Sequence, residues 1–492
     1  MIPTSPPAIN DTDPSPCPSS VHFLGVCGKA MGGIAVALAQ QGWQVSGSDE
    51  KCYSPMLEYL RDGGITIRTP YAAGNVPMGV GMVVVGKRVA STNLELEHVL
   101  ANKIPHCSFP QFLHRVFLCR SRNAVVAGGV GKTTTTSMLA WILEYAGYKP
   151  DYLIGGQTGN FSASARFAGS RHAVLEGDEY ASCFDDARPK FLHYQPEVGI
   201  ITNIIEDHPD IYHTFEDLCG VFAAFVNSIP VHGSLITSAR DIHAVRLARQ
   251  AGCRLITTGF EEDATARIGN PRFDTGGSSF ELLGAEFVLP LFGHMNVMNA
   301  AMAVLAAGEF GIQPRQAAEA LRLFAGVQNR QEEREFARTT LVSDKASHPR
   351  SLAELSRALR QRYPGRRLVS IIQPRATGGK DWVYQRDLPD ALSGFDKVIL
   401  TSAYEHNPQQ PPRWADDPFC LDLLARALED KSIHTTVSRT AEEIDGVLDD
   451  MIQDGDVVLL TILEQSHALR DRVVAALARG QCPTARREST TG

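Results

Sequence analysis

The sequence predicts an α/β protein made of three consecutive segments, each with a doubly wound parallel sheet covered by helices. Short apolar runs typical of buried strands alternate with longer stretches of helical periodicity along the body of the chain. A chain of 492 residues is also too long for one ordinary core, so two or three domains are expected. We place the segments at 21–121, 122–333 and 334–480, between tails at 1–20 and 481–492.

Composition limits the class of protein. Hydrophobic residues make up 43% of the chain and charged residues 21%, as in soluble globular proteins, and no apolar run is long enough to span a bilayer. The net charge of −8, without a dense Lys/Arg run, argues against a nucleic-acid partner. Ten scattered cysteines without metal-like spacing predict reduced thiols, with no disulfide and no zinc. The Pro- and Ser-rich start predicts a disordered tail instead of a signal peptide, and hence a cytoplasmic protein without membrane insertion.

The first segment opens on a candidate nucleotide-binding unit. The stretch "VHFLGVCGKAMGGIAVALAQQGWQVSGSDE" predicts a strand, a glycine turn, a helix and a second strand that closes on Asp49. Gly28 and Gly32 belong to that turn, where they could hold a phosphate or only let the helix pack closely on the sheet. "GMVVVGKR" predicts a further parallel strand that ends in a glycine turn.

The second segment begins with the most specific signal of the chain, "AVVAGGVGKTTTT". A strand, a glycine-rich turn with Gly128 and Gly131, and a helix start make a phosphate cradle, because free backbone N–H groups and the positive end of the helix dipole converge there. Lys132 would reach the terminal phosphates of a nucleoside triphosphate, and Thr133 would offer its hydroxyl to Mg²⁺. Further threonines follow from Thr134 onward and are poor residues for a merely structural helix start.

Acidic residues follow two later strands of this segment. They are Glu176, Asp178 and Glu179 after one strand, and Glu206 and Asp207 with His208 after another. The carboxyl ends of parallel strands meet at the crevice where α/β proteins bind ligands, and hard oxygen ligands there suit Mg²⁺. Solvated acidic loops are the alternative, and the nearby cradle favours a metal site.

Other polar residues at element ends remain open between structural and functional roles. Asn296 and Asn299 head an apolar helix and could cap it or bind a base. Arg330 lies at the start of a polar stretch, 329–340, that predicts a hinge, and it could face water or clamp a phosphate. Three more charged residues follow strands of the third segment, namely Asp344, Arg375 and Lys380.

The order of these pieces resembles the Mur ligases, the ATP-dependent amide ligases of peptidoglycan assembly. Three stretches carry the resemblance: "HFLGVCGKAMGGIA", "EGDEYASCFDDARPKFLHYQP" and "IIQPRATGGK". Within the family they are most similar to the ligases that join UDP-N-acetylmuramate to the tripeptide L-alanyl-γ-D-glutamyl-meso-diaminopimelate.

The resemblance implies a three-domain architecture and a reaction. A Rossmann-like N-terminal domain would bind the UDP-sugar, a P-loop-type central domain would bind ATP, and a Rossmann-like C-terminal domain would complete the ligase. ATP would phosphorylate the muramyl carboxylate, and the peptide amine would attack the acyl phosphate, in peptidoglycan recycling. ATP and Mg²⁺ are the implied cofactors, and the partners are the small-molecule substrates UDP-N-acetylmuramate and a peptide amine.

The resemblance also implies roles for individual residues. Those expected at the nucleotide are Gly128, Gly131, Lys132, Thr133, Thr134, Asn296, Arg330 and Asp344. Those expected in catalysis are Lys132, His208, Arg330 and Asp344. Those expected at Mg²⁺ are Thr133, Glu176 and His208. Those expected at the substrates are Gly28, Gly32, Asp49, Arg375 and Lys380.

The sequence departs from the family pattern at several of these motifs. The departures are Gly129 and Val130 in the cradle, Met295 before the central helix, and Ser343 and Ser347 in the third segment. They leave two alternatives open: a Mur-type ligase for a different amine acceptor, such as L-alanine, and a non-catalytic homologue that binds nucleotide or UDP-sugar. The "FDDARPKF" stretch argues against L-alanine.

Overall fold

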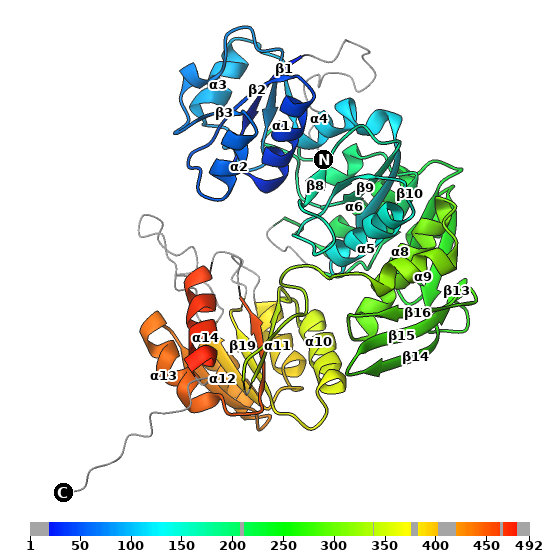
Figure 1. The fold of residues 1–492 in the computed structure, drawn as a ribbon, viewed down its shortest axis with the longest axis vertical. Helices are drawn as coiled ribbons and strands as arrows, with labels where there is room; N and C mark the ends of the chain where they lie inside the picture. The colour runs from blue at the N-terminus through cyan, green and yellow to red at the C-terminus, as the bar shows by residue number, and fades with distance from the viewer. Residues whose placement is uncertain are drawn as a thin grey trace, which may run out of the picture.

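The computed structural model describes residues 19–206, 211–337, 339–374, 382–401, 420–462 and 466–479. The expected tails at 1–20 and 481–492 lie outside this part of the chain, apart from residues 19 and 20. In Figure 1 the first segment lies at the top in blue, the central segment on the right in cyan and green, and the third at the lower left in yellow to red.

The first segment forms a five-stranded parallel sheet in the order β3-β2-β1-β4-β5. Its strands are β1 (Ser20–Leu24), β2 (Gln44–Ser48), β3 (Thr66–Arg68), β4 (Met82–Val85) and β5 (His106–Ser108). Its helices are α1 (Lys29–Gln40), α2 (Met56–Asp62), α3 (Leu94–Ala101) and α4 (Phe109–Val116). β1 and β4 lie side by side in the middle of the sheet and are almost wholly buried, as expected for strands covered on both faces.

The central segment contains an eight-stranded sheet in the order β13-β12-β11-β10-β6-β9-β7-β8, parallel except for the last pair. Its strands are β6 (Arg122–Ala127), β7 (Asp151–Leu153), β8 (Ala165–Arg166), β9 (His172–Glu176), β10 (Val198–Ile201), β11 (Ser234–Ser238), β12 (Arg254–Gly259) and β13 (Ala266–Arg267). Its helices are α5 (Lys132–Tyr145), α6 (Phe215–Asn227), α7 (Ile242–Gln250), α8 (His294–Glu309) and α9 (Pro314–Arg322). Alternate residues of β6 serve the two faces, since Val126 packs with α5 and α8 while Val125 packs with α6.

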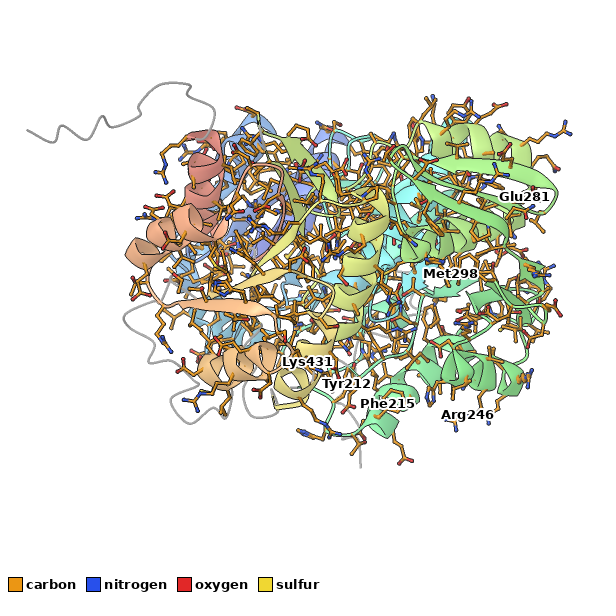
Figure 2. All side chains as sticks on the ribbon, turned by 90° about the horizontal axis from the view of Figure 1, so that it is seen from below. Tyr212, Phe215, Arg246, Glu281, Met298 and Lys431 are labelled. Carbon is orange, nitrogen blue, oxygen red and sulfur yellow. A yellow bond between two sulfur atoms is a disulfide. The ribbon has the colours of Figure 1, made fainter. Side chains whose placement is uncertain are left out.

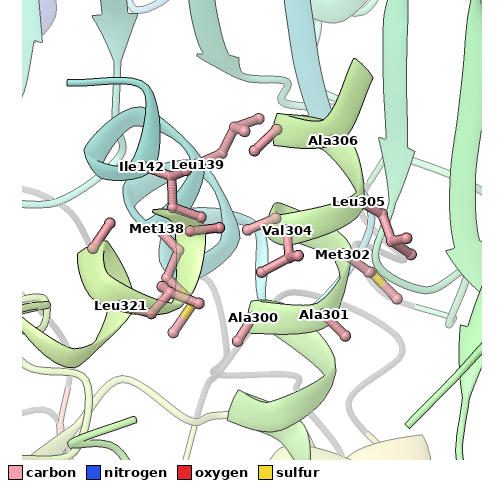
Figure 3. Close-up of a cluster of buried hydrophobic side chains, with 14 of the residues drawn as sticks. Met138, Leu139, Ile142, Ala300, Ala301, Met302, Val304, Leu305, Ala306 and Leu321 are labelled. Carbon is pink, nitrogen blue, oxygen red and sulfur yellow. The ribbon is translucent and has the colours of Figure 1, made fainter. Parts of the chain in front are cut away.

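Helix α8 is buried over most of its length and lies against α5 inside the central core. Figure 3 shows Met138 and Leu139 of α5 beside α8, which presents Ala300, Ala301 and Val304. Small side chains let the two helix backbones approach each other closely. This close packing brings Asn299 of α8 next to the glycine loop that precedes α5.

One element of the central segment differs from the expected parallel architecture. A separate antiparallel sheet follows β13 and consists of β14 (Gly269–Asp274), β15 (Gly277–Leu282) and β16 (Ala285–Leu289). Phe280 and Phe287 stack across β15 and β16, with ring centroids 5.1 Å apart. Two-residue turns, Thr275-Gly276 and Leu283-Gly284, connect its strands, a local pattern distinct from the strand-helix alternation on which the prediction rested.

The third segment forms a six-stranded sheet in the order β17-β18-β22-β19-β20-β21, parallel except for its first pair. Its strands are β17 (Glu332–Glu335), β18 (Thr340–Asp344), β19 (Leu368–Ile372), β20 (Lys397–Thr401), β21 (His434–Ser438) and β22 (Val457–Thr461). Its helices are α10 (Pro349–Arg362), α11 (Trp382–Ala391), α12 (Leu421–Glu429), α13 (Ala441–Met451) and α14 (His467–Arg479). The polar stretch 329–340, expected as a hinge, therefore contains an edge strand, whose charged residues suit a sheet edge.

Helix α10 joins the third segment to the central one, where it contacts α8 and β14. At this seam a Cβ built on Gly293 would lie 2.6 Å from the Cβ of Ala358, which is closer than two carbons can approach. None of the described helices is long and apolar enough to cross a membrane.

Candidate active site

The glycine loop between β6 and α5 has the geometry of a phosphate cradle. Gly128 and Gly131 adopt φ values of +127° and +94°, a region that favours glycine. A Cβ at Gly128 would lie 2.3 Å from Thr202 Oγ1, and one at Gly131 would lie 2.5 Å from Asn299 Oδ1. The loop thus depends on glycine at both positions, and it ends at the N-terminus of α5, where the first N–H groups have no partner within the helix.

Asn203, which follows β10, holds the loop in this shape. Its Oδ1 accepts from the Val130 N–H at 3.0 Å, its Nδ2 donates to the Val130 carbonyl at 2.8 Å, and its own carbonyl accepts from Gly129 N–H at 3.1 Å. Gly129 and Val130, the two loop residues that depart from the family pattern, are therefore held by hydrogen bonds to their backbone atoms. Such bonds do not depend on the type of side chain. Reasoning from the sequence missed Asn203, because only the pairing of β10 with β6 brings this residue to the glycine loop.

Lys132, the first residue of α5, is already paired. Its Nζ donates to Glu179 Oε2 at 2.9 Å and to the Gly128 carbonyl, and the side chains of Lys132 and Glu179 are only 11% and 2% exposed. Burial opposes the charge of Lys132, but Glu179 and then Asp178 outweigh it and raise the pKa of the amine. The lysine is therefore a fixed positive charge at the mouth of the cradle.

Thr133 and Glu176 meet beside this lysine. The Thr133 hydroxyl donates to Glu176 Oε1 at 2.9 Å, and the Gly155 N–H donates to Glu176 Oε2 at 2.6 Å. Burial raises the pKa of Glu176, so the site favours either a proton or a cation at this carboxylate. A hydroxyl and a carboxylate oxygen are hard donors that fit Mg²⁺. The described residues contain no cluster of three His, Cys, Asp or Glu side chains suited to a metal.

A cavity of about 270 Å³ gathers most of the predicted nucleotide and metal residues. Eight of them line it: Gly131, Lys132, Thr133, Thr134, Glu176, Asn296, Arg330 and Asp344. Four positions that depart from the family pattern line it as well: Gly129, Val130, Met295 and Ser347. Gly128 does not line the cavity, but its carbonyl receives Lys132. Ser343 lies in β18 outside the lining.

Asn296 on the first turn of α8 takes part in a buried amide network. Its Nδ2 donates to Gln331 Oε1 at 2.8 Å and to the Phe292 carbonyl at 3.1 Å, and its Oδ1 accepts from Asn299 at 3.3 Å. The N-cap of α8 is Gly293, which makes no side-chain cap, so Asn296 is not the helix cap. The network ties α8 to the segment that enters the third sheet.

Asp344 closes the same corner from the third segment. Its carboxylate accepts from the Gln331 N–H at 2.9 Å and from the Ala346 N–H at 2.7 Å. Burial raises its pKa, while the nearby guanidinium of Arg330 acts in the opposite direction. Both residues line the cavity that the cradle residues line.

A second cavity of about 480 Å³ adjoins the first, since Val130, Met295, Asn299 and Ser351 line both. Its walls come from the loops after β10, β11 and β12, from α8 and from α10. Met298, labelled in Figure 2, lies on its α8 wall. The His294 ring lies against Phe260 with centroids 5.3 Å apart, and burial lowers the pKa of this histidine. An apolar, aromatic wall next to a phosphate cradle suits the base of a nucleotide.

The glycine turn of the first segment is held by contacts within the same segment. Asp49 Oδ2 accepts from the Cys27 N–H at 3.0 Å, so its carboxylate helps to shape the turn. Gly28 is the N-cap of α1, whereas Gly32 lies inside α1, where a Cβ would be 2.7 Å from Met56 Sδ. Gly32 therefore supports close packing, and ligand contact by Gly28 and Asp49 stays a prediction.

The prediction that the cysteines form no disulfide is wrong. Cys27 and Cys52 form a disulfide, with their Cα atoms 5.7 Å apart. They are 25 residues apart in sequence, but parallel pairing of β1 with β2 places the turn after each strand at the same edge of the sheet. The spacing of the two cysteines in the sequence does not predict that they lie side by side in the fold.

The stretch after β9 folds into a compact loop near the cradle. Lys190 Nζ donates to Asp178 Oδ2 at 2.8 Å, and Tyr212, labelled in Figure 2, donates its hydroxyl to the Glu179 carbonyl. Burial disfavours the charge of Asp186, but hydrogen bonds from His193 and Arg188 hold its pKa well below the usual range. The acidic residues of this stretch are thus ordered by partners instead of lying in a solvated loop.

Four predicted site residues lie outside the described part of the chain: Asp207, His208, Arg375 and Lys380. Their assigned roles stay predictions.

Comparisons with known proteins agree with this architecture. Residues 126–307 match the model of the Mur ligase middle domain, and residues 20–118 match the Mur ligase family catalytic domain. The UDP-N-acetylmuramate–L-alanyl-γ-D-glutamyl-meso-2,6-diaminoheptandioate ligase of Escherichia coli is 34% identical over 426 residues, 82% of this chain and 91% of that protein. The UDP-N-acetylmuramate–L-alanine ligase of Halorhodospira halophila is 33% identical over 452 residues, 89% of this chain and 90% of that protein.

A crystal structure of a murein peptide ligase from Psychrobacter arcticus has the same fold. It superimposes with a TM-score of 0.68 at 26% identity and covers 94% of this chain and 99% of that chain. The expected α/β architecture and the expected resemblance are both confirmed, and this chain belongs to the Mur ligase family.

Proposed function

We propose that this protein is an ATP-dependent amide ligase that joins UDP-N-acetylmuramate to L-alanyl-γ-D-glutamyl-meso-diaminopimelate in peptidoglycan recycling. The observation that carries the proposal is the cavity in which Lys132, Thr133 and Glu176 face Arg330 and Asp344. The E. coli relative, 34% identical, has this activity in its name. We propose a cytoplasmic location, where ATP is available.

We assign ATP to the two adjoining cavities, with its phosphates at the cradle and its base in the larger one. Gly131, Lys132 and Thr134 would meet the phosphates from the α5 side, and Arg330 from the opposite wall. Thr133 and Glu176 would hold Mg²⁺, which would neutralise phosphate charge.

The chemistry requires two displacements. An oxygen of the muramyl carboxylate attacks the terminal phosphorus of ATP, and ADP leaves. The amine then attacks the carbonyl carbon of the acyl phosphate, phosphate leaves, and a proton is lost from nitrogen. Lys132 would stabilise the negative charge on the transferred phosphoryl group in the first step. Its raised pKa keeps it charged at neutral pH.

We propose that the segments 21–121, 122–333 and 334–480 act as UDP-sugar-binding, ATP-binding and ligase domains. Gly28 and Asp49 would then serve the sugar nucleotide through the turn after β1. Arg375 and Lys380 would meet the peptide.

L-Alanine is the second candidate acceptor, because the H. halophila L-alanine ligase is 33% identical over most of the chain. The compact loop that contains Asp186 and Lys190 favours the tripeptide, since the matching "FDDARPKF" stretch resembles the tripeptide ligases more than the alanine ligases.

ADP release by the purified protein tests the proposal. It is measured with ATP, Mg²⁺ and UDP-N-acetylmuramate, and with tripeptide, L-alanine or no acceptor, in the wild type and in Lys132→Ala. We expect turnover with tripeptide that the variant loses. Turnover with L-alanine but not with tripeptide would identify L-alanine as the acceptor. Binding of ATP or UDP-N-acetylmuramate without ADP release under any condition would indicate a non-catalytic homologue.

A further inference from the structure

Lys87 of the first segment reaches the edge of the cradle in the central segment. It follows Gly86 directly after β4, at the carboxyl end of a strand next to the centre of the first sheet. Ligands of open α/β sheets bind at this end of the strands. Lys87 is exposed, so a ligand in this place could reach its ammonium group.

The ammonium group lies over an aromatic ring that belongs to the other segment. Lys87 Nζ is 3.5 Å from the centroid of the Tyr180 ring, within the range of a cation–π contact. Tyr180 lines the 270 Å³ cavity together with Lys132 and Glu176. One ring therefore borders the phosphate cradle and also contacts a cation from the sugar-nucleotide segment.

The residues close to Tyr180 in the sequence are strongly acidic. Glu176 ends β9, Asp178 and Glu179 follow it within three residues, and Lys190 and Lys132 pair with Asp178 and Glu179 respectively. A carboxylate that approaches the cradle meets this negative potential as well as the phosphates of ATP.

We propose that Lys87 binds the carboxylate of the sugar-nucleotide donor beside Tyr180, and so makes the enzyme prefer a carboxylate-bearing UDP-sugar to a neutral one. The inference rests on the proposed function, because it assumes that the donor is a UDP-sugar acid. On this view, two lysines from different segments flank the reacting groups. Lys132 serves the phosphoryl side, and Lys87 serves the carboxylate side.

Calorimetric binding of two ligands separates this role from other roles of the lysine. UDP-N-acetylmuramate and UDP-N-acetylglucosamine share nucleotide, diphosphate and sugar ring, but only the first carries the lactyl carboxylate. We expect Lys87→Gln to weaken the affinity for UDP-N-acetylmuramate about tenfold, which corresponds to the loss of one charge-assisted hydrogen bond. The affinity for UDP-N-acetylglucosamine should stay within twofold of the wild-type value. Lys87→Arg, which keeps the charge, should retain most of the affinity.

Arg88→Gln is the matched control, since it removes the same charge from the adjacent exposed position and should leave the affinities for both ligands unchanged. Equal weakening of both ligands by Lys87→Gln would overturn the proposal and place the lysine at the diphosphate. Unchanged affinity for UDP-N-acetylmuramate would overturn it too. Binding is measured without turnover, so selective weakening in a protein that releases no ADP would uphold Lys87 while refuting the proposed function.

Discussion

Removing the side chain of Asn203 tests whether the cradle depends on its brace. Asn203→Ala deletes two hydrogen bonds to Val130, of 3.0 Å and 2.8 Å, and leaves the backbone bond to Gly129 in place. At about 1 kcal/mol for each bond, the ordered loop loses about 2 kcal/mol relative to open conformations. This corresponds to about 30-fold in the population of the ordered loop.

Two measurements report this reduced population of the ordered loop. Hydrogen exchange at the Val130 amide should accelerate by about 30-fold, since opening of the loop exposes the N–H that Asn203 protects. The dissociation constant for ATP, measured by calorimetry without donor or acceptor, should rise by up to the same factor, because binding must then order the loop. Asn270→Ala, which removes an exposed amide that bonds Glu281 on the antiparallel sheet, is the control and should change neither.

The expected pattern is specific. If Asn203→Ala exchanged faster at Val130 but bound ATP as tightly as the wild type, the loop would not be the phosphate site. If neither quantity changed, the two side-chain bonds would contribute nothing to loop order, and the argument from distance would fail.

Three further predictions concern stability. Gly131→Ala should lower the free energy of unfolding, measured by urea titration, by about 2 kcal/mol. The left-handed backbone is strained for alanine, and the new Cβ would lie 2.5 Å from Asn299 Oδ1. A variant as stable as the wild type would contradict this. Asp186→Asn should be less stable than the wild type at pH 7, and this difference in stability should narrow as the pH falls below 3.8, because a carboxylate with a depressed folded-state pKa contributes stability that is lost at low pH. Thermal melts across pH check this, and a difference in stability that stays constant with pH would refute it. Cys52→Ser should remove about 3 kcal/mol from the first segment in oxidising buffer and nothing in reductant, as expected for a cross-link that spans 25 residues; equal effects in both buffers would show that Cys27 is not cross-linked in solution.

The cradle was predictable because its signals are local. A strand, glycines and a lysine–threonine pair occupy ten consecutive positions, so the sequence of β6 and α5 contains the whole motif. The parallel sheets were predictable for the same reason, since each strand-helix unit is continuous in sequence. Features that depend on two distant segments were not accessible. Asn203 under the loop, Gln331 between Asn296 and Asp344, and the disulfide at the first turn all arise from neighbours that only the folded topology creates.

The contact between Gly293 and Ala358 also limits how this enzyme can change over evolution. Gly293 has no room for one additional carbon, so the junction between α8 and α10 requires glycine at this position. A mutation that enlarges Gly293 would have to push α10 away from α8, and with it the wall that Arg350 and Arg357 contribute to the larger cavity. Divergence towards new amine acceptors is therefore expected in the loops of the third sheet, while Gly293 is retained in every active descendant.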